Sequence, residues 1–367
     1  MQSRRGLRVT ERLLVEALPS EGPATLLAGL DTEGAVAIAA RSLWGAAPAV
    51  SWFHLDAYIA RKVEGVLSRN GAKDVKVLLA TDLPGVAVPG EPEPAQVPGL
   101  DLIALPFPTT GEALLGRELI EESHAALRQG GRLLAATDNA KGDWLRKVLK
   151  EIFGGKVGIK LQEKRGVVYV ATRTRERAEV RDHRHTVKLD ARASGDGAPR
   201  TLELGTRPGV FGNARLDAGT RALAERLDVR EGERVLDLGC GYGPLGLAAA
   251  LRAREAVLVD SNARAVLLAG RNAAANGLAN VQALLRADLE GLEGPFDLAL
   301  ANPPYFSNFR IARAFVERAS QLLRRGGRLA LVAKAAEEHA AIVRELIGEP
   351  KVELSPGGYG IISVVKL

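Results

Sequence analysis

The sequence predicts an α/β protein built from two tandem copies of one fold. Three observations favour this class. Short apolar strands alternate with helix-length segments in the second half of the chain, which is typical of a parallel sheet covered on both faces. The 367 residues suffice for about two domains. Sequence landmarks of the first half recur at equal spacing in the second half.

The composition excludes several protein classes. With 46% hydrophobic and 26% charged residues, the chain is typical of globular proteins and not of largely disordered ones. We find no stretch approaching the ~20 apolar residues of a membrane helix and no secretory signal at the N-terminus, so we expect a cytoplasmic protein that does not bind membranes. The single cysteine, Cys240, excludes an internal disulfide, and the histidines lack thiol partners for zinc, so we expect no metal.

Positive charge is concentrated in one stretch. The chain has a net charge of +6, and Lys141–Lys188 contains 14 Lys or Arg residues against six Asp or Glu residues. Two interpretations of this stretch stay open. It is either a solvated linker with ion pairs or a surface that faces the phosphates of a nucleic acid.

In the second half we expect regular alternation of strands and helices. The predicted strands are Arg234–Leu238, Ala256–Asp260, Val281–Leu285, Phe296–Ala301 and Arg328–Val332. The predicted helices are Leu245–Leu251, Ala263–Asn276, Ile311–Leu323 and Glu337–Ile347. The remaining segments, Lys351–Leu354 and Ile361–Lys366, predict a closing hairpin.

The first half repeats this pattern. Asp101 begins an apolar strand and is followed after 29 residues by Gly130, which opens a Gly-Gly-Arg-Leu sequence. Asp297 and Gly326 stand in the same relation at the same spacing. We infer a gene duplication, with domains at 1–175 and 206–367 joined by a charged linker at 176–205.

The two copies differ where a ligand would bind. After its first strand the second copy has Gly239-Cys240-Gly241-Tyr242-Gly243, whereas the first has only Gly29 and Gly34 in the corresponding stretch. After its fourth strand the second copy has Asn302, whereas the first has Pro106 and no amide side chain. We therefore interpret 1–175 as a degenerate, catalytically inactive copy kept for stability or substrate docking.

The glycine-rich turn predicts a cofactor site. Glycines let a ligand touch the main chain, and the turn opens a helix whose N–H groups favour polar or anionic groups. Asp260 ends the next strand and suits ribose hydroxyls, and Asp288 follows a third strand and could meet an adenine amino group. These features predict an adenosine-containing cofactor, either a dinucleotide or S-adenosyl-L-methionine (AdoMet), since the turn also fits G-x-G-x-x-G. The predicted cofactor-binding residues of this region are Asp237, Gly239, Cys240, Gly241, Gly243, Asp260, Ser261, Asp288 and Asn302.

The sequence Asn302-Pro303-Pro304-Tyr305 predicts the catalytic loop. It follows a predicted strand at its carboxyl end, where ligands bind in open parallel sheets. Two prolines stiffen the loop and leave carbonyl groups exposed. The Asn302 oxygen and the Pro303 carbonyl would accept both hydrogens of an exocyclic amine, which aims its lone pair at a methyl group. The alternative is a proline-stiffened strand exit with core aromatics.

Aromatic residues gather after the two prolines. Tyr305, Phe306 and Phe309 lie within five residues, although aromatic residues make up only 4% of the chain. We expect Tyr305 to stack on a base, a contact worth ~1–3 kcal/mol. Phe306 and Phe309 are further candidates for substrate binding.

Together these motifs resemble class I AdoMet-dependent methyltransferases that act on planar nitrogen. The segment 206–220, with Phe211-Gly212 and Asp217-x-Gly219, is similar to the ribosomal RNA small-subunit methyltransferase C family and its large-subunit relative. The resemblance implies two Rossmann-like methyltransferase domains, with Phe211 and Gly212 lining the substrate pocket. It places Asp217 and Gly219 near the methionine end of AdoMet. Family members often have Phe-His after the two prolines, where this chain has Tyr305-Phe306.

The resemblance implies methylation of the exocyclic N2 amine of a guanine in ribosomal RNA, most directly 16S rRNA. The partner would be this RNA or the small ribosomal subunit, and the protein a monomer. Alternatives that stay open are a 23S rRNA guanine-N2 methyltransferase, an adenine-N6 methyltransferase and a protein-glutamine methyltransferase. Outside this class stand an NAD-dependent oxidoreductase and a non-enzymatic RNA-binding module.

Overall fold

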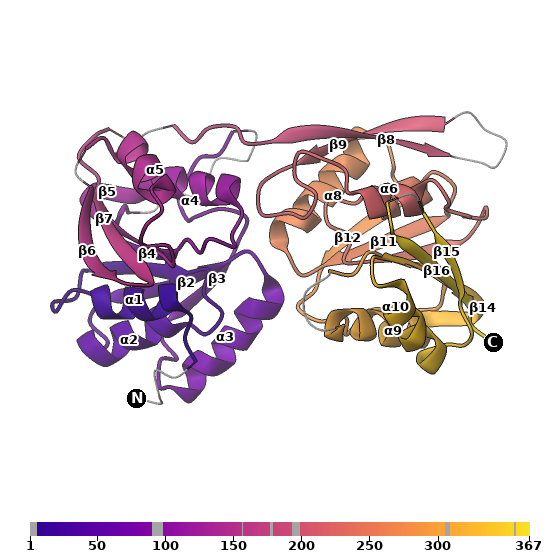
Figure 1. Ribbon diagram of the computed structural model, residues 1–367, viewed down its shortest axis with the longest axis horizontal. Coiled ribbons are helices and arrows are strands. Elements are labelled where there is room, and N and C mark those ends of the chain that lie inside the picture. Colours follow the sequence, from indigo (N-terminus) through magenta and orange to yellow (C-terminus); the bar gives the residue numbers. More distant parts are fainter. Residues whose placement is uncertain are drawn as a thin grey trace. The chain divides into compact units, whose positions relative to one another are not determined.

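A computed structural model describes residues 6–89, 98–155, 157–176, 179–192, 199–304, 309–355 and 357–367, the side chain of residue 192 excepted. The chain divides into two compact units, Met1–His183 and Arg184–Leu367 (Figure 1). Among the described residues, no helix is long and apolar enough to cross a membrane. The same residues contain no group of three or more His, Cys, Asp or Glu side chains that could hold a metal ion.

The first unit is a sheet covered by helices on both faces. Its helices are α1 (Val9–Ala17), α2 (Ala35–Trp44), α3 (Ala57–Arg69), α4 (Ala113–Ala126) and α5 (Trp144–Phe153). Its strands are β1 (Thr25–Gly29), β2 (Ala49–His54), β3 (Lys76–Leu79), β4 (Leu100–Pro106), β5 (Leu127–Thr137), β6 (Val157–Glu163) and β7 (Gly166–Thr172). They are ordered β3-β2-β1-β4-β5-β7-β6. The pairs from β3 to β5 are parallel, and β7 pairs antiparallel with β5 and β6.

The second unit repeats this path. Its sheet has the order β12-β11-β10-β13-β14-β16-β15, with the same parallel and antiparallel pairs. Its helices are α6 (Ala218–Ala224), α7 (Pro244–Ala250), α8 (Ala263–Ala275), α9 (Arg310–Leu322) and α10 (Ala336–Leu346). The strands of this sheet are β10 (Arg234–Leu238), β11 (Glu255–Asp260), β12 (Val281–Leu285), β13 (Phe296–Ala301), β14 (Leu323–Ala333), β15 (Lys351–Leu354) and β16 (Gly360–Val365).

The predicted duplication is confirmed by this order and by matching contacts. In the first unit Asp101 accepts the backbone N–H of Thr25 at 2.8 Å and the Nε of Arg128. In the second unit Asp297 accepts the backbone N–H of Arg234 at 2.7 Å and the Nε of Arg324 at 2.5 Å. The glycines at the repeated Gly-Gly sequences, Gly130 and Gly326, have φ angles of 77° and 73°. Each copy therefore keeps the same joint between its first, fourth and fifth strands.

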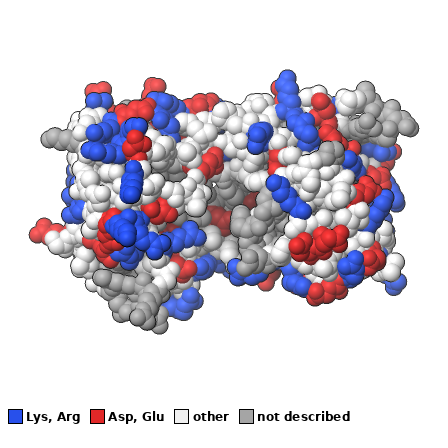
Figure 2. All heavy atoms as spheres, viewed as in Figure 1, with Lys and Arg blue, Asp and Glu red and all other residues white. Residues whose placement is uncertain are grey.

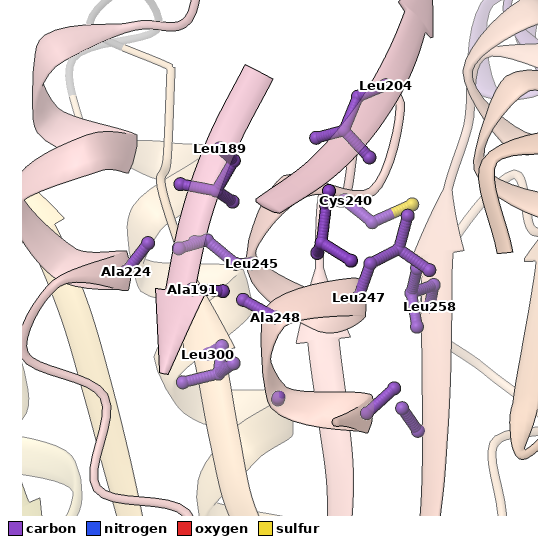
Figure 3. Packing of buried hydrophobic residues seen from close by; sticks show 14 of the residues in the cluster. Leu189, Ala191, Leu204, Ala224, Cys240, Leu245, Leu247, Ala248, Leu258 and Leu300 are labelled. Atoms are coloured by element: carbon purple, nitrogen blue, oxygen red, sulfur yellow. The ribbon is translucent and has the colours of Figure 1, made fainter. Parts of the chain in front are cut away.

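The predicted linker at 176–205 differs from the structure. Most of its second half forms an antiparallel hairpin of β8 (His185–Arg192) and β9 (Pro199–Thr206), which belongs to the second unit. Alternate apolar side chains of the hairpin are buried against α7 (Figure 3). Asn272 of α8 also exchanges hydrogen bonds with both backbone groups of Gly205. In both strands the buried apolar residues alternate with charged or polar ones, so the segment as a whole has the charged composition of a linker.

The basic stretch Lys141–Lys188 is also folded. It contributes α5, β6 and β7 to the first unit and the first half of β8 to the second. Several of its acids form ion pairs, such as Glu163 with Arg12 and Asp143 with Lys147. On the face of the first unit seen in Figure 2, Lys and Arg side chains lie in patches together with Asp and Glu side chains. The stretch is therefore not a linker. Asp143, Glu151 and Glu163 form ion pairs, whereas lysines such as Lys150 and Lys160 are exposed. Contact of this surface with the phosphates of a nucleic acid stays a prediction.

Candidate active site

The glycine-rich turn joins β10 to α7 at the carboxyl end of the sheet. Gly239, Gly241 and Gly243 have φ angles of 70°, 56° and 95°, a region that favours glycine. The N–H of Gly241 donates to Oδ2 of Asp260 at 2.8 Å. A Cβ atom on Gly241 would meet no described atom within 4 Å, whereas one on Gly239 would lie 2.9 Å from the ring of Phe315. Gly241 therefore borders open space, and Gly239 packs against the protein.

The side chains of Asp237 and Cys240 support this turn from within the unit. Asp237 is 1% exposed, and its Oδ2 accepts the N–H of Gly246 at 2.8 Å. Burial, together with the charge of Asp260, raises the pKa of Asp237 to about 7. The Cys240 side chain packs in an apolar cluster with Leu258 (Figure 3), and burial raises the pKa of its thiol. Both residues are predicted cofactor ligands, but their side chains position the turn instead of lining open space.

The two acids predicted to bind adenosine lie at the same edge of the sheet as the glycine-rich turn. Asp260 ends β11, and its Oδ1 accepts the N–H of Asn262 at 2.9 Å. The half-buried Ser261 follows it. Asp288 lies after β12, where its Oδ1 accepts the N–H of Glu290 at 3.1 Å. Because β12, β11 and β10 are neighbours, the structure brings these loops to one edge with the glycine-rich turn.

Asn302 follows β13, the strand on the other side of β10, and its side-chain orientation is fixed. Its Nδ2 donates to Oδ2 of Asp217 at 3.1 Å and to Oγ1 of Thr220 at 2.8 Å. Asp217 caps α6 by accepting the N–H of Thr220 at 2.9 Å. Since both amide hydrogens are engaged, Oδ1 is the side-chain atom of Asn302 that remains to accept a donor. Next along the chain, Pro303 is buried and Pro304 half-buried.

The predicted aromatic group is only partly described. Tyr305 and Phe306 lie outside the described residues, so base stacking by them stays a prediction. Phe309 is 39% exposed, has a φ of 61° and precedes α9. Its ring meets His339 of α10 edge-on, with the ring centroids 5.2 Å apart. Contact of Phe309 with a substrate also stays a prediction.

The segment that precedes α6 places Gly212 beside the glycine-rich turn, and contact of the neighbouring Phe211 with a substrate stays a prediction. Phe211 is 59% exposed. Gly212 has a φ of 77°, and a Cβ on it would lie 3.2 Å from the ring of Tyr242. Burial and the charge of Asp217 raise the pKa of the Tyr242 hydroxyl well above its usual range. The structure thus brings Gly212 close to the glycine-rich turn.

The half-buried Asn262 and the buried Arg264 fix this segment to the edge of the sheet that carries Asp260. Nδ2 of Asn262 donates to the carbonyl of Gly209 at 2.7 Å. The guanidinium of Arg264, which is 1% exposed, donates to the carbonyl of Pro208 at 2.8 Å. Both donors lie at the start of α8, immediately after the loop that carries Asp260.

The first unit fills the corresponding turn with its own side chain. By the strand register, Leu30 corresponds to Gly239 and Asp31 to Cys240. Leu30 has a φ of 59°, so it keeps the left-handed backbone of Gly239. Asp31 is 1% exposed and accepts the N–H groups of Glu33 and Gly34. Burial and the charge of Glu11 raise its pKa to about 6. A carboxylate of the protein thus engages the backbone N–H groups directly ahead of α2.

The other ligand positions of the first unit are also changed. His54 stands where the second unit has Asp260, and burial lowers its pKa to about 4. Pro106 stands where the second unit has Asn302, and Ala28 where it has Asp237. The first unit therefore lacks the carboxylate at the position of Asp260, the amide at the position of Asn302 and the carboxylate at the position of Asp237 that supports the turn.

Sequence reasoning misses several residues of the site. Thr220 follows Asp217 by three positions, which is the spacing of a helix cap and could have indicated this pair. Tyr242 lies inside the glycine-rich turn, but no pattern indicates that its ring turns toward Gly212. Tyr359, from the closing hairpin, reaches Asp217 across 142 residues, and no local signal predicts this contact.

Comparison with known proteins places this geometry in a family. A family model described as methyltransferase small domain matches residues 201–363. A ribosomal RNA small subunit methyltransferase C of Chromohalobacter salexigens is 32% identical over 252 residues, which cover 66% of this chain and 72% of that protein. The protein of the same name from Pseudomonas entomophila is 31% identical over 166 residues. This alignment covers 44% of the present chain and 50% of that protein, so the chain spans about half the length of this relative.

A solved structure shows the same fold over the whole chain. The T. thermophilus 16S rRNA N2 G1207 methyltransferase (RsmC), in complex with AdoMet and guanosine, matches with a TM-score of 0.75 and 24% identity. The match covers 100% of this chain and 94% of that one, so the tandem arrangement is common to both. Because the chain is 32% identical to the Chromohalobacter protein over 72% of that protein's length, it belongs to the ribosomal RNA small subunit methyltransferase C family.

Proposed function

We propose that the second unit transfers a methyl group from AdoMet to the exocyclic N2 amine of a guanine in 16S rRNA. The observation that carries this proposal is the fixed amide of Asn302 beside the glycine-rich turn. Its oxygen is the acceptor that an amino group requires. The names of the family's members support the choice of small-subunit rRNA over 23S rRNA.

The residues of the turn fit AdoMet. Gly241 borders open space, so a ligand can approach its backbone. Asp260 presents a half-buried carboxylate beside it, which suits ribose hydroxyls. Asp288 would meet the adenine, and Asp217 and Gly219 would lie near the methionine end. Asp237 and Cys240 would act indirectly, by holding the turn.

AdoMet, when bound, supplies an electrophilic methyl group on a sulfonium sulfur. Oδ1 of Asn302 and the carbonyl of Pro303 accept the two hydrogens of the guanine amine. These hydrogen bonds orient the nitrogen lone pair, which is otherwise delocalised into the ring, so the protein contributes mainly position and orientation. Phe211, Gly212, Tyr305, Phe306 and Phe309 would hold the base, which must leave any helix to reach the loop.

The first unit would serve stability or rRNA docking. Its exposed lysines and arginines support contact with phosphates. The filled turn at Asp31 supports the absence of a second AdoMet site. We further propose that the protein works as a monomer in the cytoplasm, on rRNA or on the assembled small subunit.

A methyl-transfer assay with tritiated AdoMet tests the proposal. Separate reactions contain 16S rRNA, small subunits, 23S rRNA, DNA and a release factor, and labelled RNA is digested to nucleosides. The expected product is N2-methylguanosine from 16S rRNA, free or assembled. Label in 23S rRNA, adenine or glutamine would replace the proposal with the matching alternative. Purified protein that retains NAD and binds no AdoMet would refute methyl transfer.

A further inference from the structure

The closing hairpin holds one tyrosine rigidly at the edge of the site. Tyr359 immediately precedes β16 and is 7% exposed. Its carbonyl accepts the N–H of Ser355 at 2.7 Å and the hydroxyl of Ser355 at 3.0 Å. These two bonds close the turn between β15 and β16 and fix the backbone from which the ring projects.

The ring of Tyr359 reaches the N-terminus of α6. Its hydroxyl donates to Oδ1 of Asp217 at 3.4 Å. A Cβ on Gly219 would lie 2.7 Å from the ring and 3.1 Å from Oδ2 of Asp217. Position 219 therefore has to be glycine for the tyrosine to lie against Asp217. The ammonium of Lys334 lies 5.3 Å from the ring centroid, and Lys334 directly follows β14, which pairs with β16.

Asp217 connects this tyrosine to the catalytic amide. Its Oδ2 accepts from Nδ2 of Asn302 and from the N–H of Thr220, while its Oδ1 faces the Tyr359 hydroxyl. A carboxylate that accepts from the amide nitrogen fixes the amide orientation and draws negative charge toward the amide oxygen. The Tyr359 hydroxyl donates to the same carboxylate, so its part is to hold the orientation of Asp217 and not to add polarisation. With Asp217 held in this orientation, Oδ2 stays directed at the amide nitrogen, and the amide oxygen stays directed at the position where the guanine amine would bind.

The first unit has lost every member of this chain. Pro106 corresponds to Asn302, and α1, which corresponds to α6, begins after Arg8 instead of an aspartate. By the β5–β7 register, Gly166 corresponds to Tyr359. A Cβ on Gly166 would lie 2.6 Å from Leu13 of α1, so no side chain fits there. The tyrosine occurs with the amide and disappears with it.

We propose that Tyr359 is a positioning residue for methyl transfer, which acts through Asp217 on the amide of Asn302. The proposal rests on the proposed function. It assigns to the closing hairpin a part in orienting the amine of the substrate, in addition to completing the sheet.

Replacement of single atoms tests this relay, by which we mean the hydrogen bonds from Tyr359 to Asp217 and from Asn302 to Asp217. Tyr359→Phe removes the hydroxyl and keeps the ring against Gly219. We expect kcat for guanine methylation to fall about fivefold, with the KM for RNA and the Kd for AdoMet unchanged within about twofold. The matched control, Tyr169→Phe, alters a buried tyrosine of the first unit and should leave kcat unchanged. In an Asp217→Asn background, Tyr359→Phe should have little further effect, because the relay is already broken.

A second measurement does not depend on turnover. The side-chain amide signal of Asn302 in a ¹⁵N spectrum, assigned by its loss in Asn302→Ala, should shift in Tyr359→Phe and stay in place in Tyr169→Phe. Wild-type kcat in Tyr359→Phe, multiplicative effects with Asp217→Asn, or an unmoved amide signal would each overturn the relay. Wild-type protein that forms no N2-methylguanine would refute the proposed function instead, and the amide signal would still decide on the relay.

Discussion

At the start of the fourth strand, Asp101 of the first unit and Asp297 of the second make the same hydrogen bonds to the first strand and to an arginine of the fifth. At the carboxyl ends of the same strands the two units differ at nearly every position. The first unit has Asp31 where the second has Cys240 and Pro106 where it has Asn302. The comparison shows that the contacts between the first, fourth and fifth strands are common to both copies, whereas the edge at which we propose that ligands bind differs between them.

The difference is physical as well as chemical. In the first unit the buried Asp31 accepts the N–H groups of Glu33 and Gly34 ahead of the helix that follows the first strand, so the protein itself engages these two donors. In the second unit the small, buried Cys240 leaves Gly241 beside open space. The two turns therefore differ in how their N–H groups are engaged, and the following predictions test how far this difference extends.

Removal of the catalytic amide should have the largest effect. In Asn302→Ala we expect kcat to fall about 100-fold or more, because the acceptor for the guanine amine is lost, with the Kd for AdoMet changed less than about threefold. Steady-state methylation and calorimetric titration measure the two quantities. Pro106→Ala, at the same position of the first unit, is the control and should leave both unchanged. Near-normal turnover of Asn302→Ala would show that the loop has another role.

A methyl group in the open turn should block the cofactor. Gly241→Ala meets no described atom within 4 Å, so only a ligand collides with it, and we expect AdoMet affinity to fall about tenfold or more. Gly71→Ala is a matched control in the first unit, since Gly71 has a φ of 73° and equally open surroundings. Each change should cost about 1–2 kcal/mol of stability from backbone strain. Equal AdoMet affinities in the two variants would contradict the placement of the cofactor.

The buried Asp237 should make the stability of the second unit depend on pH. Its pKa rises from 3.8 when unfolded to about 7 when folded, so its stabilising contribution is complete below about pH 4 and is lost as the pH rises through 7. Asp237→Asn keeps an oxygen for the N–H of Gly246 but removes this loss. The variant should therefore gain stability relative to the wild type, by a few kcal/mol, between about pH 5 and about pH 8.

Urea unfolding of both proteins at the two pH values measures this change. The first unit serves as an internal reference because it has Ala28 at the corresponding position and is not altered by the substitution. A stability difference that does not vary with pH would mean that Asp237 is already ionised in the folded protein.

The shared joint should respond alike in both units. Asp101→Asn and Asp297→Asn each weaken a charge-assisted hydrogen bond to an arginine, and each should lower the free energy of unfolding by about 1 kcal/mol. Denaturation curves of the two variants measure this cost. Costs that differ by more than about twofold would show that the two scaffolds have diverged as well.

Much of this account follows from local sequence. The predicted bounds of strands such as Val281–Leu285 and Phe296–Ala301 are confirmed residue for residue. A short apolar run between two turns defines the start and the end of a strand in the sequence itself. The equal spacing of Asp101 to Gly130 and Asp297 to Gly326 predicted the duplication because both glycines stand in the same left-handed turn. The fold class needed no information beyond such patterns.

The remainder depends on contacts between distant residues. The hairpin β8–β9 hides five apolar residues among charges, so its composition indicated a linker. Asp237 resembles a ligand in sequence, but the close approach of Gly246 turns its carboxylate inward. The contact of Tyr359 with Asp217 joins two loops only after the sheet has formed. No pattern along the chain encodes these three results.

The number of AdoMet molecules bound per chain tests most directly the claim that one of two duplicated units kept the chemistry. Calorimetric titration of the full chain should give one equivalent, unchanged in Asp31→Asn and abolished or strongly weakened in Gly241→Ala. Two equivalents in the wild type, or binding that is lost with Asp31→Asn and kept with Gly241→Ala, would contradict the account.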